Sequence, residues 1–283
     1  MEEKIVISVA SGKGGTGKTT VAVNLALSLN ENAQFLDCDV EEPNAHIFLK
    51  PEITHAQSIG VPIPQVDEEK CTYCGKCAQV CLYNAIAVVK EKVLVFPELC
   101  HGCGGCALLC PEKAIKEVNK PIGVVEEGKA DSIQFIQGKL DIGEMMAPPL
   151  IRAVKRAANS NQITIIDVSP GTSCPVIEAV KDSDFCILVT EPTPFGLNDL
   201  ILAVEVLRKI KVPFGVVINR ADVGDKKVDE YCQKEKIPIL MRIPMDREIA
   251  ISYSKGIPIV EEKPDYKEKF KRLYRQVETM VLK

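Results

Sequence analysis

The first residues suited to chemistry form a glycine-rich loop with two lysines, Ser11 to Thr20. Residues 12–19 fit the pattern G-x-x-x-x-G-K-[ST], which follows a strand-like apolar run and opens a helix-like one. Glycines let backbone N–H groups curl around phosphates, and the start of a helix adds partial positive charge. The pattern predicts that Lys18 reaches the β- and γ-phosphates of a nucleotide and that the Thr19 hydroxyl binds Mg²⁺. The expected nucleotide contacts in the loop are Gly12, Lys13, Gly14, Gly15, Thr16, Gly17, Lys18, Thr19 and Thr20.

The second chemically capable group is a doubled cysteine pattern between Cys71 and Cys110. Each half has the spacing C-x₂-C-x₂-C-x₃-C, which is typical of bacterial two-cluster ferredoxins. In such runs the fourth cysteine ligates the other cluster, so the spacing predicts two 4Fe–4S clusters. The first set of ligands is predicted to be Cys71, Cys74, Cys77 and Cys110, and the second Cys100, Cys103, Cys106 and Cys81. Zinc is the alternative, because C-x₂-C pairs also build zinc sites.

The elements that must position these residues alternate between strands and helices. Apolar, β-branched runs at 5–10, 35–39, 163–168, 185–190, 214–219 and 238–243 predict strands. Helical spacing of apolar residues occurs at 19–29, 149–158, 197–210, 225–235, 247–255 and 265–281. This alternation predicts an α/β fold with a mostly parallel, doubly wound sheet.

The cysteine-rich part differs in texture from the rest of the chain, because its apolar runs are short. We expect a P-loop domain made of residues 1–63 and 121–283, with a small α+β ferredoxin-like domain, 64–120, inserted at a surface connection. The flanks at 61–64 and 120–121 are rich in proline and are expected to be linkers.

Bulk composition narrows the class of protein and its partners. The 283 residues carry a net charge of −4, which offers no electrostatic case for nucleic acid as a partner. The start of the chain does not resemble a signal peptide, and no apolar stretch approaches the roughly 20 residues that span a bilayer. A cytoplasmic location is expected, where the 12 cysteines should stay reduced rather than form structural disulfides.

Lys13 is the first residue of a motif that resembles that of a known family. The run Lys13 to Thr19 resembles the deviant Walker A motif, K-G-G-x-G-K-[ST], of the MinD/ParA/nitrogenase-iron-protein superfamily, and the likeness extends over residues 1–60 and 120–283. The resemblance implies an ATPase in which Lys13 crosses a homodimer interface to the partner's phosphates when ATP binds. It further implies that Asp39 positions the attacking water or the Mg²⁺ shell, that Asp167 holds that shell, and that the Gly171 N–H senses the γ-phosphate.

The sequence pattern expected to bind the base of the nucleotide is less specific than the phosphate loop. Residues 217–222 resemble the adenine-side strand end of the superfamily, which implies that Asn219 contacts the base, with Asp222 nearby. The pattern N-x-x-D is also how GTPases read guanine, since a carboxylate accepts from guanine N–H donors. ATP is favoured because proteins with the extra lysine predominantly use ATP.

Four cysteines lie outside the doubled pattern. Cys38, Cys186 and Cys232 fall in apolar or helical runs and are expected to be buried. Cys174 follows Asp167 at the place where the nitrogenase iron protein has a cluster ligand, but a second such ligand has no counterpart here. A metal role for Cys174 is therefore the minority hypothesis.

Three functions remain open, and the first is the leading one. The chain resembles MinD-like ATPases with an inserted ferredoxin domain, which implies that an ATP-driven dimer switch serves electron transfer or iron–sulfur or metal-centre assembly with a partner protein. A MinD-like spatial or regulatory ATPase with clusters as redox sensor is the alternative, and an amidating or ligating enzyme is disfavoured. The apolar stripe of 265–281 is expected to pack on the protein's own sheet rather than on a membrane.

Overall fold

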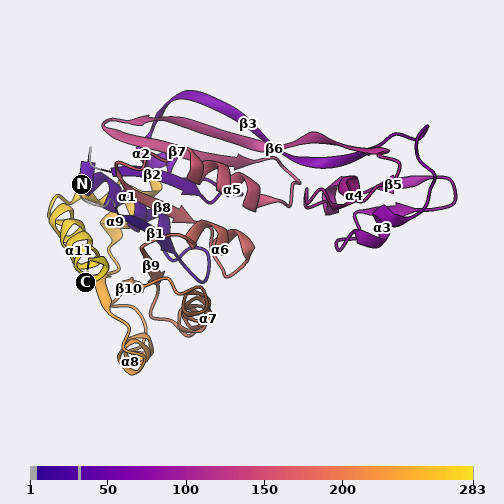
Figure 1. Cartoon of the computed structure of the whole chain (residues 1–283). Helices are drawn as coiled ribbons and strands as arrows, with labels where there is room; N and C mark the ends of the chain where they lie inside the picture. Colours follow the sequence, from indigo (N-terminus) through magenta and orange to yellow (C-terminus); the bar gives the residue numbers. More distant parts are fainter. Residues whose placement is uncertain (1–4, 31–32, 283) are drawn as a thin grey trace.

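A computed structural model describes residues 5–30 and 33–282. Over these residues the main sheet has nine strands in the order β11-β10-β9-β1-β8-β2-β7-β6-β3. The strands from β11 to β7 are mutually parallel, whereas β6 pairs antiparallel with both β7 and β3. Figure 1 shows this sheet with helices on both faces and a long arm that leaves it at one edge. The α/β class with a mostly parallel sheet is therefore as predicted.

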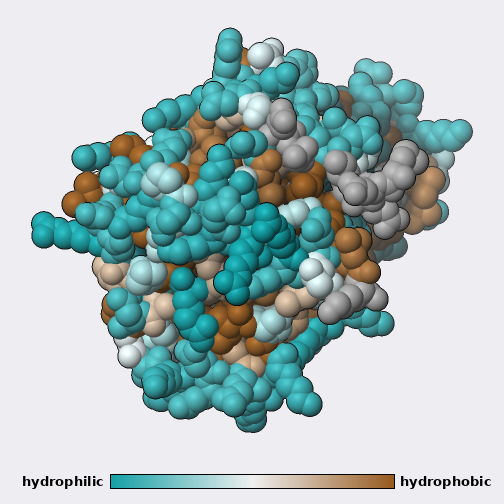
Figure 2. All heavy atoms as spheres, turned by 90° about the vertical axis from the view of Figure 1, so that its left-hand side faces the viewer, coloured by the Kyte–Doolittle hydropathy of each residue, from teal (hydrophilic) through white to brown (hydrophobic). Residues whose placement is uncertain are grey.

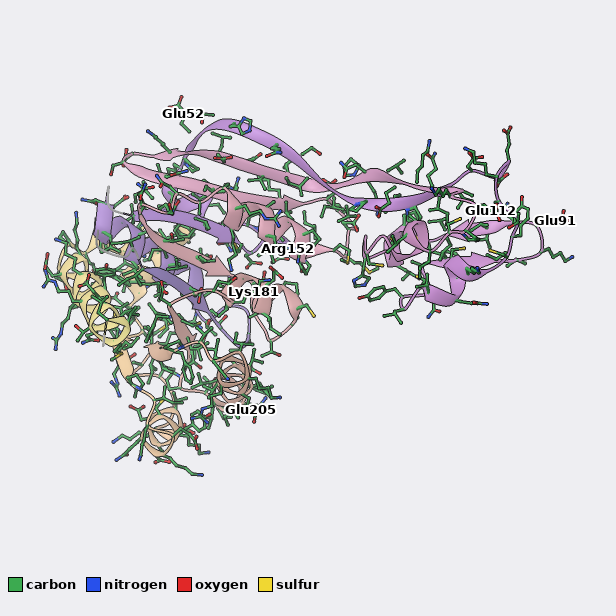
Figure 3. All side chains as sticks on the ribbon, viewed as in Figure 1. Glu52, Glu91, Glu112, Arg152, Lys181 and Glu205 are labelled. Atoms are coloured by element: carbon green, nitrogen blue, oxygen red, sulfur yellow. The ribbon has the colours of Figure 1, made fainter. Side chains whose placement is uncertain are left out.

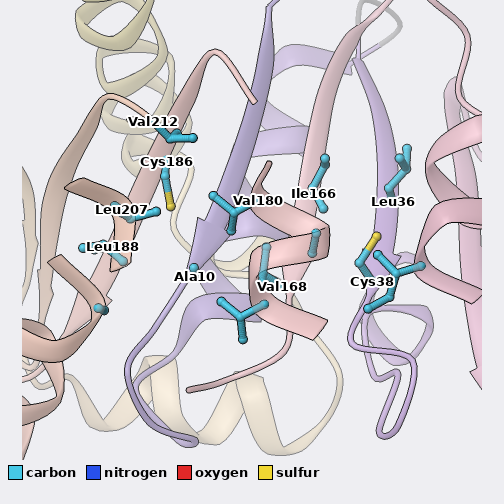
Figure 4. Packing of buried hydrophobic residues seen from close by; sticks show 14 of the residues in the cluster. Ala10, Leu36, Cys38, Ile166, Val168, Val180, Cys186, Leu188, Leu207 and Val212 are labelled. Carbon is cyan, nitrogen blue, oxygen red and sulfur yellow. The ribbon is translucent and has the colours of Figure 1, made fainter. Parts of the chain in front are cut away.

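The seven mutually parallel strands described in this sheet are short, apolar and mostly buried on both faces, as parallel strands must be. They are β1 (Val6–Ala10), β2 (Ala33–Cys38), β7 (Ile133–Leu140), β8 (Ile163–Val168), β9 (Phe185–Thr190), β10 (Phe214–Asn219) and β11 (Ile239–Ile243). One face is covered by α5 (Ala147–Arg156), α6 (Cys174–Val180), α7 (Pro194–Ile210) and α8 (Lys227–Lys234). Figure 4 shows part of this core, with Ala10, Ile166 and Val168 packed against Val180 of α6.

The other face of the sheet is covered by helices from both ends of the chain. They are α1 (Lys18–Leu29), α2 (His46–Leu49), α9 (Arg247–Ser254), α10 (Ile259–Glu262) and α11 (Asp265–Val281). The apolar stripe of α11 is buried, with Phe270 and Val277 each 0% exposed, and it packs against α1. The prediction that this stripe packs within the protein is confirmed. The face that carries α11 accordingly presents mainly hydrophilic side chains (Figure 2).

The arm is a two-stranded antiparallel ribbon that carries the cysteines. Its strands are β3 (Glu52–Val66) and β6 (Ile115–Ala130). The residues expected to be linkers, 61–64 and 120–121, lie inside these paired strands. Pro62 and Pro64 fit there because β3 is the edge strand, and Pro121 lies beside a register shift and beyond the part of β6 that pairs with β7.

The cysteine module, residues 67–114, begins and ends where the ribbon ends, since Val66 and Ile115 are paired. It contains the helices α3 (Lys76–Val80) and α4 (Gly105–Leu108), the hairpin β4 (Ile86–Val88) and β5 (Val93–Val95), and the 3₁₀ turn η2 (Pro97–Leu99). Glu91 and Glu112 mark the part of the module farthest from the sheet, and Glu52 lies at the opposite end of the ribbon (Figure 3).

Candidate functional site

The phosphate loop joins β1 to α1 at the carboxyl edge of the sheet. Gly17 adopts φ 92° just before α1, and a Cβ there would lie 2.5 Å from the Asn219 amide nitrogen. A Cβ on Gly12 would lie 2.2 Å from the carbonyl oxygen of Asp199. Both positions therefore require glycine, because α7 and the end of β10 approach the loop backbone closely.

Lys18 is the buried cation of the site. Its Nζ lies 2.7 Å from Asp39 Oδ2 and 3.5 Å from Asp167 Oδ1, and Asp37 lies nearby on β2, where it pairs with Asp167 of β8. Burial alone would lower the pKa of Lys18, but the charges of Asp167 and Asp39 outweigh it and raise that pKa. The ammonium is therefore charged at neutral pH, as its predicted contact with phosphates requires.

One lysine cannot neutralise three buried carboxylates. Burial, and next the charge of Asp167, raise the pKa of Asp37 to about 8, although an N–H from Ala45 opposes the shift. Asp37 also accepts hydrogen bonds from the backbone N–H groups of Asp39 and Asn44, at 3.1 and 3.2 Å. Asp37 thus shapes the loop after β2, whereas Asp39 lines the cavity beside the phosphate loop.

The donor set around Asp167 suits a hard divalent cation. Burial raises the pKa of Asp167 despite the charge of Lys18, and the Thr19 side chain hydrogen-bonds to this carboxylate. The second oxygen of Asp167 is buried without a hydrogen-bond partner. A hydroxyl and a carboxylate side by side are ligands that Mg²⁺ prefers, so the residues present fit that ion.

A cavity of about 410 Å³ opens beside the loop. Its phosphate side is formed by Gly14, Gly15, Gly17, Lys18, Thr19, Thr20 and Asp39. Its far side is formed by Asn219 and Arg220 together with Pro244, Met245, Asp246, Ile249, Ala250 and Tyr253. The sequence did not indicate these last six residues, because no motif marks the loop after β11; only their position after a parallel strand points to the site.

Asn219 and Asp222 form hydrogen bonds that connect the segments around this cavity. The Asn219 amide donates to the Thr16 carbonyl at 2.8 Å, and its oxygen accepts from the Arg220 N–H. The Asp222 carboxylate accepts from the Met245 N–H at 2.5 Å and does not line the cavity. In this arrangement Asn219 ties the base side to the phosphate loop, and the base contacts assigned to these two residues remain predictions.

The segment after β8 lies next to the phosphate loop. The Gly171 N–H donates to the Ser11 carbonyl at 2.9 Å, and Pro170 lines the cavity. The contact between Gly171 and a γ-phosphate remains a prediction, and it requires this hydrogen bond to break. Lys13 lies at the edge of the loop, with its side chain 31% exposed and its Nζ 3.8 Å from Glu191.

The eight cysteines of the module gather in two groups. One cavity is lined by Cys71, Cys74, Cys77 and Cys110, and a second by Cys81, Cys100, Cys103 and Cys106. Within the described ranges, no three His, Cys, Asp or Glu side chains converge to hold a single metal ion. All twelve cysteines of the chain are free thiols. The second cavity also touches Pro62, Pro64 and Glu117 of the ribbon, whereas the first touches Val66 and Ile115 at its end.

The two halves of the module repeat each other in structure. Gly75 and Gly104 precede α3 and α4 with φ 76° and 72°. The Cys81 sulfur accepts from the Ala85 N–H and the Cys110 sulfur from the Ala114 N–H, each at 3.3 Å. Such N–H donors favour a thiolate, the form that binds iron. The donor set therefore fits two iron–sulfur clusters.

The remaining cysteines divide as expected. Cys38, Cys186 and Cys232 are buried, and burial raises the pKa of the Cys186 thiol to about 12 and that of Cys232 to about 11. Cys174 is exposed at the first position of α6. No helix within the described ranges has the length and apolar character to cross a membrane.

Comparisons with known proteins place this site in a family. The family description "CobQ/CobB/MinD/ParA nucleotide binding domain" matches residues 7–259. An uncharacterized protein of Methanocaldococcus jannaschii is 33% identical, with 90% of this chain and 91% of that protein covered. An iron-sulfur cluster carrier protein of Pyrococcus horikoshii is 28% identical, covering 91% and 79%. The septum site-determining protein MinD of P. horikoshii, solved with Mg-ADP, has a similar fold: the TM-score is 0.62 at 22% identity, covering 98% of this chain and 97% of that one.

Proposed function

The chain belongs to the CobQ/CobB/MinD/ParA nucleotide-binding family of P-loop ATPases, and we propose that it couples an ATP-driven dimer switch to electron transfer or to iron–sulfur or metal-centre assembly. The observation that carries the proposal is the pairing of two sites in one chain. A complete phosphate loop lies at the carboxyl edge of the sheet, and two groups of four cysteines lie on an arm continuous with that sheet. The similarity to iron-sulfur cluster carrier proteins supports iron–sulfur chemistry.

The chain's own residues supply the electrostatics of hydrolysis. Lys18 turns from Asp39 toward the β- and γ-phosphates, which frees the Asp39 carboxylate to orient the attacking water. Thr19 and Asp167 would hold Mg²⁺, which would supply positive charge to neutralise the phosphate oxygens. Lys13 reaches the phosphates of a partner subunit in the closed dimer. The nucleotide is ATP in this proposal, and Asn219 and Asp222 set the base side.

The cysteine module supplies the second half of the function. Cys71, Cys74, Cys77 and Cys110 would hold one 4Fe–4S cluster, and the other four cysteines a second, each of which supplies one-electron transfer when bound. The division into residues 1–63 with 121–283 and an inserted 64–120 belongs to this proposal. The ribbon gives a mechanical route between the two parts, since β6 pairs with both β7 of the sheet and β3 of the arm.

Metal analysis tests the proposal directly. Protein purified without oxygen should contain about eight iron and eight sulfide per chain, with a broad absorbance that dithionite bleaches. Cys110→Ser should damage the cluster shared with Cys71, Cys74 and Cys77, although Cys110 is distant in sequence. Cys174→Ser is the matched control, because this thiol is exposed on α6, away from both cavities, and should leave the iron content unchanged. Stoichiometric zinc without sulfide would refute the proposal.

A further inference from the structure

Glu191 is a buried carboxylate that the sequence does not single out. It follows β9 directly and is 7% exposed. Its two oxygens contact two cations: Oε1 lies 3.0 Å from Arg220 Nη1 and Oε2 lies 3.8 Å from Lys13 Nζ. The three residues come from the ends of three neighbouring strands, because β9 lies between β1 and β10 in the sheet.

The two cations differ in what they can do. Arg220 lines the nucleotide cavity and donates a hydrogen bond to Glu191, so it anchors the carboxylate. The Lys13 ammonium stands farther from the carboxylate, at 3.8 Å and beyond hydrogen-bonding distance, so this contact is the weaker of the two. A buried carboxylate with two cationic partners can lose one of them without a large cost in free energy only if the other partner remains. Lys13 is thus the cation that can leave the Glu191 carboxylate.

We infer that Glu191 is a positioning residue: it holds Lys13 in the open chain and releases it to the partner's phosphates on closure, while Arg220 keeps Glu191 paired. This inference rests on the proposed role of Lys13 across the dimer. Because Glu191 competes with the partner's phosphates for Lys13, the contact opposes closure. Arg220 weakens that opposition, since it shares the carboxylate.

The test uses variants with opposite expected effects. Sedimentation velocity with a saturating non-hydrolysable ATP analogue gives the protein concentration of half-dimerisation. Glu191→Gln removes the competitor in both subunits and should lower that concentration about fourfold to twenty-five-fold, because each of the two partly exposed ion pairs contributes a factor of about two to five. Arg220→Gln leaves Glu191 with Lys13 alone and should raise it by a similar factor. The double variant, Glu191→Gln with Arg220→Gln, should have the same concentration of half-dimerisation as Glu191→Gln alone, because Arg220 acts only through Glu191.

Three controls separate this inference from the alternatives. Glu191→Asp keeps the charge and should stay near wild type. Glu235 forms a comparable ion pair with Arg208, at 2.9 Å, that is remote from the phosphate loop. Glu235→Gln should therefore leave the concentration of half-dimerisation unchanged. A purely structural Glu191 would make Glu191→Gln and Arg220→Gln both weaken dimerisation, and that result would overturn the inference.

Lys13→Ala distinguishes failure of this inference from failure of the proposed function. If Lys13→Ala abolishes dimerisation while Glu191→Gln has no effect, the inference alone is wrong. If Lys13→Ala dimerises like wild type, the sandwich mechanism is wrong, and the role of Glu191 falls with it.

Discussion

We expect Lys18 to have two tasks, because it lines the cavity beside the loop and also faces a buried acidic cluster. Without nucleotide, Lys18→Ala leaves Asp39 and Asp167 buried and unpaired, so we expect the free energy of unfolding to fall by about 3–5 kcal/mol. Lys13→Ala is the matched control, and a loss below about 1 kcal/mol is expected because Lys13 is partly exposed. Urea unfolding of both variants measures this difference; equal losses would contradict the assignment.

Asp37 should make stability fall as the pH rises. Its pKa in the folded chain is about 8, above the ordinary value of 3.8, so the folded state binds more protons than the unfolded state between these values. The stabilisation is complete below the unfolded pKa and is lost as the pH rises through about 8. Asp37→Asn cannot titrate, so its urea midpoints between pH 5.5 and 8.5 should decline less steeply than those of wild type. Parallel declines would show that Asp37 is ionised throughout.

At the scale of elements, the ribbon separates folding of the sheet from folding of the cysteine module. Val66 and Ile115 are paired where the ribbon ends, so replacing 67–114 by Asn-Gly should close β3 and β6 as a two-residue hairpin. The shortened chain should bind ATP and unfold within a few degrees of the full chain, but contain no iron. Calorimetry and metal analysis check this expectation. An insoluble product would show that the module is needed for the sheet to fold.

Helix α11 is a structural element, because its stripe lies against α1. Leu273 is 1% exposed, so Leu273→Ala should cost about 2–5 kcal/mol of unfolding free energy. Met280 is 42% exposed near the end of the same helix, and Met280→Ala should cost less than about 1 kcal/mol. Denaturant unfolding compares the two. A small effect of Leu273→Ala would mean that the stripe is free for another partner.

Contacts between α5 and α6 connect the segment after β8 to the arm. Lys155 donates to the carbonyls of Glu178 and Ala179 at 3.1 and 3.2 Å, and Arg152 pairs with Glu178 at 3.2 Å. Lys181 pairs with the same carboxylate at 2.7 Å, and Figure 3 shows Arg152 and Lys181 on the same side of the sheet. Since α5 also packs on β3 and β6, a shift of α6 has a packed route to the ribbon.

At the scale of the whole molecule, the proposed switch is a change of assembly. Lys13→Ala should keep most of its ADP affinity, because Lys18 acts within the chain, yet lose ATP-dependent dimerisation and hydrolysis. The physical reason is that two sets of phosphates cannot meet across a dry interface without added cations. Light scattering should show wild type moving from 31.0 kDa to twice that mass with a non-hydrolysable ATP analogue, and not with ADP. Normal hydrolysis by Lys13→Ala would mean that the loop works within a single chain.

The sequence by itself determined the features that local patterns encode. The phosphate loop is contiguous, so its glycines and Lys18 identified it without a structure. The alternation of elements and the stripe of α11 were likewise local, and the α/β class and the helix 265–281 followed from them. The cysteine spacing predicted the two groups of four cysteines in the same way, because three members of each group are close in sequence and the fourth comes from the other half of the repeat.

Only the tertiary structure decided how distant segments meet. The strands β3, β6 and β7 were not expected, because proline and polar residues obscure their periodicity and their stability comes from pairing with one another and with β2. Glu191 and Met245 reach the site for the same reason: parallel order brings the ends of β9 and β11 to one edge. Strand order arises from contacts between residues far apart in sequence, which no local pattern records.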